Sequence, residues 1–441
     1  MVPLRQEGTS IRDLGARAGE SAVERSPVKE LGTGRIPERA DQGAIRRNNL
    51  EVVLRHLALL GPASRATIAK RAGLSPATVS RLVAELAGLH LVREIGLERP
   101  GRAGRPGARL ELDRRHLLAL GAEINVYSLT VIVTDLAGSL VSEHRQPLDA
   151  LALGPHGAAR SLAVTCQEVV QSLGPTTGRL ARRVTGIGVA VPGLVHSTDG
   201  VVDQAPNLGW RDFNLADELH SRLPWHGVPI TVGNDANLAV QAEYFAGAHS
   251  GAPNLAYLTG DVGIGGGFIV EGRPLLGPRG QAGEVGHMTV DPGGPTCACG
   301  RTGCWEARIG LAAFLKSVKL PLAAGTPPEQ IARAIADRAR RGDPEILIAL
   351  EELGRWIGLG AANLVNILGT EVILLGGYFC GLSEWILAPA RATLRQQIMS
   401  EAAAGCLLTV STLGYRAAAL GGAIHAVDQV LSNPSLLRDE F

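Results

Sequence analysis

Four potential metal ligands crowded into one short stretch constrain this chain more than any other feature of its sequence. His287 is followed by Cys297, Cys299 and Cys304, and the glycines inside this run allow the backbone to turn tightly around a common centre. One imidazole and three thiolates complete a tetrahedral Zn²⁺ shell and leave no position for a catalytic water. The cluster therefore predicts a structural zinc ion, and cysteines used in this way are typical of a cytoplasmic protein.

Charge is distributed unevenly along the 441 residues, although the formal net charge is only +1. Residues 44–115 hold 14 Lys and Arg against 6 Asp and Glu, whereas residues 1–43 are balanced, so the remainder of the chain is acidic. A basic module on an acidic body indicates that the first part meets a polyanion. The first 25 residues are too charged for a signal peptide, and no later run reaches the ~18 apolar residues of a membrane helix. Neither export nor a membrane partner is expected.

Residues 65–84, inside the basic module, fit a helix-turn-helix. Gly73 suits a left-handed turn between two helices, and Ser75 followed by Pro76 is a strong helix start. The side chains left facing outward on the second helix are short or basic, as major-groove contacts require. The candidates for DNA contact are Thr78, Ser80 and Arg81. A helical bundle without a DNA-binding role is the alternative, and the local basic excess argues against it.

Residues 90–112 predict a wing, which consists of two short strands joined by a tip rich in Arg, Gly and Pro. Arg102 and Arg105 lie on this tip, where arginine side chains can enter a narrow minor groove. We therefore expect a winged helix-turn-helix DNA-binding domain at residues 44–115. Residues 1–43 show no periodicity and are expected to be a disordered extension.

Strands and helices alternate after residue 115. Strand patterns occur at His116–Val133 and Gly138–Val141, and a strand, a Gly-rich turn and a strand occur at 254–270. Helices are expected at Ala158–Leu173 and Ile346–Leu368. Two regions that begin with similar strand–turn–strand patterns predict an α/β body of two lobes with a cleft between them. The expected limits are 116–432 for this body, with lobe one at about 116–238 plus the C-terminal helix, lobe two at about 239–419, and a tail at 433–441.

Several motifs in this body resemble those of the ROK family of repressors and sugar kinases. They are Val191-Pro192-Gly193, Pro206-Asn207-Leu208-Gly209-Trp210, Asn234-Asp235-Ala236-Asn237, Gly283-Glu284-Val285-Gly286-His287, the Cys-x-Cys-Gly-x-x-Gly-Cys run at 297–304, and Trp305-Glu306. The resemblance runs from about Ala119 to Val430, and the winged helix ahead of it is similar to the layout of the regulator branch, in particular its actinobacterial members. It implies a two-lobed, actin-like sugar-kinase (ribonuclease H-like) fold with the sugar in the cleft.

The resemblance also implies which residues bind the sugar: Asn207, Asn234, Asp235, Glu284, His287 and Glu306, with Gly193 close by. Carboxylates and amides suit this role because a pyranose presents a ring of hydroxyls that both donate and accept. His287 would bind zinc through one ring nitrogen and face the sugar with the other. In the kinases of the family, the residue at Asp235 is the general base that deprotonates the attacking hydroxyl.

The phosphate-binding loops depart from the family pattern. The first loop of the kinases reads Asp-x-Gly-Gly-Thr, and the corresponding positions here hold Glu123, Asn125, Val126 and Tyr127. The second loop reads Gly-Thr-Gly, where this chain has Asp261-Val262-Gly263. Side chains would fill the space that glycines leave for phosphate, and Asp261 would repel a triphosphate. We therefore expect neither ATP binding nor catalytic residues.

The sequence thus predicts a sugar-responsive transcription regulator, with repression of carbohydrate genes as its expected mode, although repressors and activators look alike at this level. Its expected partners are double-stranded operator DNA, a sugar or sugar phosphate effector, and further copies of the chain in a homodimer or homotetramer. An ATP-dependent sugar kinase with a DNA-binding appendage is the alternative. A zinc- or redox-sensing regulator that ignores sugars is a third interpretation, which the closed ligand set disfavours.

Overall fold

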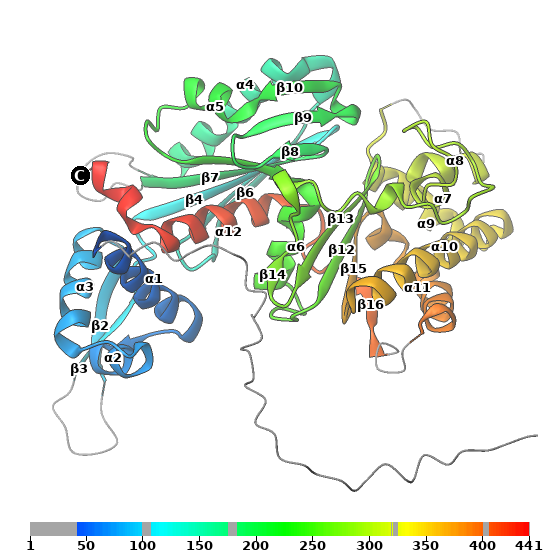
Figure 1. The fold of residues 1–441 in the computed structure, drawn as a ribbon. Helices are drawn as coiled ribbons and strands as arrows, with labels where there is room; N and C mark the ends of the chain where they lie inside the picture. The colour runs from blue at the N-terminus through cyan, green and yellow to red at the C-terminus, as the bar shows by residue number, and fades with distance from the viewer. Residues whose placement is uncertain are drawn as a thin grey trace, which may run out of the picture.

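The computed structural model describes residues 42–98, 107–174, 183–318, 320, 325–399 and 405–440. The expectations for residues 1–41 and for the wing-tip residues Arg102 and Arg105 lie outside the described residues. The described chain is a mixed α/β structure in which a small N-terminal module lies beside two sheets, each flanked by helices (Figure 1).

The N-terminal module has the winged-helix arrangement that the sequence predicts, with an antiparallel sheet of order β1-β3-β2. The Ser64 hydroxyl accepts from the backbone N–H of Thr67 at the start of α2, and Gly73 ends that helix at φ 65°. The Ser75 hydroxyl accepts from the Thr78 N–H and caps the start of α3. The elements are α1 (Gln42–Leu60), β1 (Ala63–Ser64), α2 (Arg65–Ala72), α3 (Pro76–Gly88), β2 (Val92–Glu98) and β3 (Gly107–Leu112).

The first lobe is built on a sheet of order β11-β7-β4-β5-β6, with a smaller antiparallel sheet, β10-β9-β8, at one end. The single strand expected over His116–Val133 is wrong, because the chain reverses at residues 125–127 and forms two antiparallel strands. The expected helix at 158–173 begins earlier, and Gly154 at φ 65° breaks its first turns. The elements are β4 (Leu117–Ile124), β5 (Ser128–Asp135), β6 (Leu140–Pro147), α4 (Ala150–Ser172), β7 (Arg183–Val191), β8 (Leu194–His196), β9 (Val201–Ala205), η1 (Pro206–Leu208), β10 (Trp210–Asn214), α5 (Leu215–Arg222) and β11 (Ile230–Asn234).

The second lobe is built on a sheet of order β14-β13-β12-β15-β16, and the hairpin of α10 and α11 lies at its far end (Figure 1). Residue 238, the expected limit between the two lobes, lies inside helix α6. The expected domain limits stay predictions. The elements are α6 (Asp235–Ala246), β12 (Leu255–Gly260), β13 (Ile264–Val270), β14 (Arg273–Pro274), η2 (Pro278–Gly280), η3 (Val285–His287), α7 (Glu306–Ile309), α8 (Leu311–Val318), α9 (Pro328–Arg340), α10 (Pro344–Leu368), β15 (Val372–Gly377), α11 (Tyr378–Gln397), β16 (Leu407–Val410) and η5 (Gly414–Arg416).

Helix α12 (Ala417–Ser432) packs between the sheet of the first lobe and α6, and it does so at backbone contact. A Cβ atom on Gly421 would lie 1.9 Å from the Leu238 carbonyl oxygen of α6, and one on Gly422 would lie 2.3 Å from the Gly188 carbonyl oxygen of β7 on the other side. Glycine is therefore required at both positions, because any side chain would separate the elements. The helix consequently couples the position of α6 to that of the first lobe.

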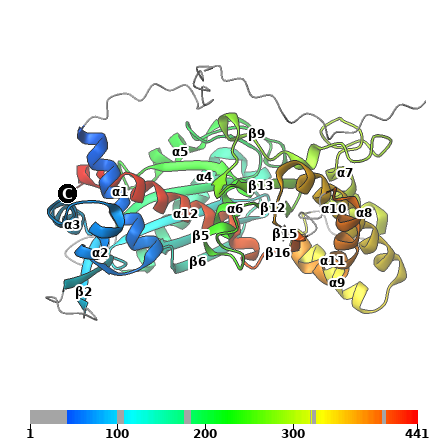
Figure 2. The same cartoon turned by 60° about the horizontal axis from the view of Figure 1, so that its bottom comes forward.

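The winged helix is not a separate body on a flexible tether. One hydrophobic cluster contains side chains of the module, such as Leu54, together with Leu117 of β4 and Val430 of α12. Arg55 of α1 adds an ion pair with Asp428 at 2.9 Å and a hydrogen bond to Ser432 Oγ at 2.8 Å. Figure 2 shows α12 extending from the lobes to α1. The end of the described chain, η6 (Pro434–Glu440), also packs against this cluster.

Within the described ranges, no helix is long and apolar enough to cross a lipid bilayer.

Candidate functional site

The four expected metal ligands come together in space. His287, Cys297, Cys299 and Cys304 each place one donor atom so that all four atoms lie within 4.8 Å of one another. His287 Nδ1 is 3.8 Å from Cys297 Sγ, and Cys299 Sγ is 3.6 Å from Cys304 Sγ. Three thiols and an imidazole at these separations form a donor set that fits a metal ion. Since Nδ1 faces the cysteines, Nε2 on the other side of the ring remains for another partner.

The loop that carries these ligands is anchored on the second lobe. Gly303 has φ 78°, and a Cβ atom there would lie 1.9 Å from the Asp291 carbonyl oxygen, so this position requires glycine. Trp305 is completely buried, and its indole N–H donates to the Trp356 carbonyl of α10 at 2.8 Å. The metal loop is therefore fixed to the long helix of the lobe by the residue that follows its last cysteine.

Glu306 connects the metal loop to the cleft between the lobes. Its Oε2 accepts from the Ile264 backbone N–H at 2.9 Å, and its Oε1 lies 3.5 Å from Cys297 Sγ. A Cβ atom on Gly263 would be 2.8 Å from Glu306 Oε2 and 3.5 Å from Asn207 Nδ2, so both side chains approach this glycine. Asn207 comes from η1 of the first lobe and Glu306 from the second, and the structure brings them together across the cleft.

Asn234 and Asp235 lie where β11 ends and α6 begins. The Asn234 side chain caps the helix, since its Oδ1 accepts from the Asn237 N–H at 3.1 Å, while its Nδ2 donates to the Gly193 carbonyl at 3.0 Å. Asn234 thus also fixes the Val-Pro-Gly loop. Asp235 Oδ1 accepts from the Ala236 N–H at 2.8 Å. Burial raises the pKa of Asp235 to about 7, and the nearby charges of Asp261 and Glu284 act in the same direction.

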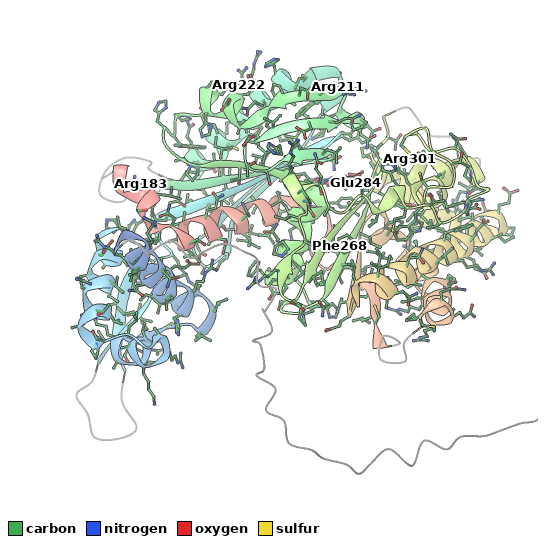
Figure 3. The ribbon with its side chains drawn as sticks, in the orientation of Figure 1. Arg183, Arg211, Arg222, Phe268, Glu284 and Arg301 are labelled. Carbon is green, nitrogen blue, oxygen red and sulfur yellow. The ribbon has the colours of Figure 1, made fainter. Side chains whose placement is uncertain are left out.

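Glu284 lies where the two lobes meet (Figure 3). Burial raises the pKa of its carboxyl group, the His287 ring opposes this shift, and Glu306 adds to it. Electrostatic contact thus runs from Asp235 through Glu284 to Glu306. Glu284 thus interacts electrostatically with Asp235, His287 and Glu306, and the Asn207 side chain approaches Glu306 at Gly263. The sugar-binding role expected for Asn207, Asn234, Asp235, Glu284, His287 and Glu306 stays a prediction.

A polar recess continues from Asp235 to the place where the kinase pattern has its phosphate loops. Asn125 fills part of it, because its Nδ2 lies 2.5 Å from Asp261 Oδ2 and 3.1 Å from Glu123 Oε1. Burial raises the pKa of Glu123 to about 8 and that of Asp261 to about 6. The described residues that line this recess are Glu123, Asn125, Asp235, Ala239, Tyr257, Thr259, Asp261, Gly377, Gly414, Tyr415 and Ala418.

A cluster at the edge of this recess was missed by the sequence analysis. Arg145 of β6 pairs with Glu329 of α9 at 2.8 Å, and its guanidinium lies 5.0 Å from the centre of the Tyr415 ring. This contact joins the first lobe to the second. Its members are far apart in the chain, and none belongs to a motif, so no local pattern could have revealed it.

The outward face of α3 presents part of the expected DNA-reading set. Ser80 and Arg81 are exposed, whereas Thr78 is half-buried and its hydroxyl lies 2.8 Å from Ser75 Oγ. Lys70 and Arg71, at the end of α2, are also exposed and were not among the sequence candidates. The only sequence signal for Lys70 and Arg71 was the excess of basic residues in the N-terminal module.

Comparison with known proteins gives a consistent result over most of the chain. The ROK family model matches residues 120–429. The xylose repressor of Bacillus subtilis (strain 168) is 28% identical over 396 residues, which cover 89% of this chain and 98% of the repressor. A solved ROK family transcriptional regulator, described as a homologue of the E. coli MLC protein, is 27% identical with a TM-score of 0.74, and the match covers 89% of this chain and 98% of that one. A ROK family glucokinase from Streptomyces griseus, solved with glucose and AMPPNP, is 28% identical with a TM-score of 0.57 over 70% of this chain and 98% of the enzyme.

Proposed function

This chain belongs to the ROK family, and we propose that it is a transcription regulator, acting as a repressor, whose DNA binding is controlled by a sugar held between its lobes. The observation that carries the proposal is the common hydrophobic core of the winged helix, the first lobe and α12. A DNA-binding module that shares its core with the first lobe and α12 can respond to a movement of that lobe when sugar binds. The regulators that resemble the chain do so over nearly their whole length, which includes their N-terminal parts.

Helix α3 is the proposed reading element. Ser80 and Arg81, with Thr78 at the start of the helix, would contact base edges in the major groove, and Arg102 and Arg105 would reach the minor groove. A homodimer would present two recognition helices to half-sites roughly 34 Å apart, one turn of DNA. Gel shifts on specific and scrambled sites test these roles, because loss of a base contact relaxes sequence choice whereas loss of a wing contact weakens binding evenly.

The proposed sugar site uses Asn207, Asn234, Asp235, Glu284, His287 and Glu306. Carboxylates accept from sugar hydroxyls, and the Asn207 amide and His287 Nε2 can donate to sugar oxygens. The metal is proposed to be a structural Zn²⁺. It would fix the His287 ring through Nδ1 and hold the loop from which Glu306 enters the cleft.

The proposed path from sugar to DNA follows two helices. Asn234 and Asp235 hold the sugar at the first turn of α6, and the same helix meets Gly421 of α12 at backbone contact through Leu238. Helix α12 then reaches the DNA-binding module, where Asp428 pairs with Arg55. Since α12 offers no side chain at Gly421 to absorb movement, a shift of α6 on sugar binding would be passed to α1.

We also propose that the chain is not a kinase. Glu123, Asn125 and Asp261 stand at phosphate-loop positions of the kinase pattern, and their side chains line one recess of the structure. A triphosphate there would meet like charge within a buried recess. The alternative, a sugar kinase with a DNA-binding appendage, rests on the similarity to the glucokinase. Hexose-dependent ADP release that disappears in Asp235→Asn would establish it.

The experiment that tests the proposal combines a thermal-shift panel with gel shifts on an operator selected from random DNA. A sugar at one hundred times its Kd should add about 2.7 kcal/mol of stability and change operator affinity, while ATP should do neither. Asp235→Asn should abolish the shift, and Asp337→Asn, an exposed acid on α9, should retain it. Stabilisation by ATP, or a sugar that binds without any change in DNA affinity, would contradict the proposal.

A further inference from the structure

Strand β6, at the edge of the first-lobe sheet, makes several contacts with the second lobe beside the recess. Arg145 of β6 pairs with Glu329 of α9 at 2.8 Å, and its guanidinium lies 5.0 Å from the centre of the Tyr415 ring. On the same strand, Glu143 lies 3.6 Å from the guanidinium of Arg416. The contacts of β6 therefore reach both α9 and η5, the short helix that leads into α12.

A further contact between the lobes lies deeper in the recess. Asn125, in the turn between β4 and β5, donates to Asp261 of the second lobe at 2.5 Å. Arg145 attracts the same carboxyl group, and its charge opposes the effect of burial, which raises the pKa of Asp261 to about 6. Asp261 is thus mostly ionised near neutral pH, so Arg145 faces two acids of the second lobe.

Protein atoms fill most of the space between these contacts. The hollow among Asn125, Arg145 and Glu329 has a volume of about 20 Å³, and the recess next to it has a volume of about 30 Å³. Each is about the room that one water molecule needs. The glucokinase of Streptomyces griseus was solved with AMPPNP as well as glucose. In this chain, side chains bridge the two lobes at this end of the cleft.

We propose that Arg145 and Glu329, together with Asn125 and Asp261, form a clasp that holds the two lobes together at the recess end without any ligand. The clasp joins two points of the first lobe to two points of the second, so the lobes cannot separate at this end unless both contacts break. Relative movement of the lobes is therefore largest at the far end of the cleft, away from the clasp.

The clasp also gives Arg145 and Glu329 a positioning role, and this part of the proposal rests on the proposed function. A sugar held between Asn207 and Glu306 needs the lobes at one separation, and the clasp removes part of the freedom that sugar binding would otherwise have to remove. Tyr415 lies against Arg145 shortly before α12 begins, so a rotation of the lobes about the clasp acts on the start of that helix.

Hydrogen exchange of the full chain without ligand tests the clasp itself. Glu329→Ala, in the second lobe, should speed the amide exchange of β6 in the first lobe about two- to fivefold, and Arg145→Ala should do the same at the start of α9. Arg340→Ala is the matched control. Arg340 pairs with Asp337 at 2.9 Å and lies over the Trp385 ring, but both partners belong to the second lobe. This control should leave the exchange of β6 unchanged. Unchanged exchange across the lobes in both clasp variants would overturn the proposal.

Calorimetry with glucose, xylose and N-acetylglucosamine tests the positioning role. For the sugar that binds the parent protein, Arg145→Ala and Glu329→Ala should each raise the Kd about three- to tenfold. The double variant should bind no more weakly than Arg145→Ala, because both substitutions break the same contact. Arg340→Ala should keep the parent's Kd. Additive losses, or unchanged affinity in both clasp variants, would overturn the positioning role. If none of the three sugars binds the parent or alters its operator affinity, the proposed function fails, and the exchange measurement still decides whether the clasp exists.

Discussion

Replacing Glu123 by glutamine should stabilise the protein at pH 8 and change it little at pH 5. Glu123 lies on β4 in the recess, and burial is the main reason why its pKa rises from 4.5 to about 8. Its Oε1 accepts from Asn125 Nδ2 at 3.1 Å, and a glutamine oxygen can accept the same bond. The substitution therefore removes the charge and keeps the known contact.

The magnitude follows from the two pKa values. Because the pKa is higher in the folded protein, the unfolded chain binds fewer protons between pH 4.5 and 8, and stability falls as pH rises through this window. At about 1.4 kcal/mol for each pKa unit, the carboxyl group costs about 4 kcal/mol at pH 8 and less than about 1 kcal/mol at pH 5. The glutamine variant should thus gain on the order of 3 kcal/mol over the parent between these pH values.

Urea unfolding at pH 5, 6, 7 and 8, with intrinsic fluorescence as the signal, measures this difference. The midpoint of Glu123→Gln should move above that of the parent as pH rises, whereas Glu384→Gln, with an exposed carboxyl group, should follow the parent at every pH. A stability difference that does not depend on pH, or a variant less stable at pH 8, would refute the assignment of Glu123 as a buried carboxyl group that loses stability on ionisation.

Three further outcomes are expected. Gly421→Ala would place a Cβ atom 1.9 Å from backbone of α6, and it should cost about 1–3 kcal/mol in chemical unfolding, whereas Gly405→Ala, with nothing within 4 Å, should cost much less. Arg55→Ala should lower stability by roughly 1 kcal/mol or less and weaken the effect of sugar on operator affinity, because it removes the contacts of α1 with Asp428 and Ser432. Sugar binding measured by calorimetry should stay intact. An equal effect of sugar on operator affinity in parent and variant would count against the α12 path. Cys304→Ser should reduce bound zinc, measured by elemental analysis, and weaken sugar binding because Glu306 and the metal share one loop; a parent protein with less than half a zinc per chain would contradict the site.

Local chemistry explains why parts of the fold could be predicted from the sequence. The cap at Ser75 and the turn at Gly73 depend on single residues and their immediate neighbours, and they are confirmed. The reversal after Ile124 was missed although Asn125 and Ser128 interrupt the apolar run there, because both flanking strands are buried and the turn contains neither Gly nor Pro. The early start of α4 was missed because Gly154 and Pro155 are typical of loops.

The sequence by itself determined which groups are available for chemistry, because the candidate metal ligands, the candidate sugar-binding acids and the altered phosphate-loop positions are fixed by residue type and spacing. Tertiary structure decided what those groups do to one another. Asn125 bridges Glu123 and Asp261 across 136 residues of chain, Arg145 finds Glu329 across 184, and Arg55 meets Ser432 across 377. Such pairs leave no mark in a local pattern, since they arise when packing of the two lobes and α12 brings distant segments together. Burial also depends on tertiary structure. The pKa values of the recess carboxyl groups are raised because the folded chain excludes water from them.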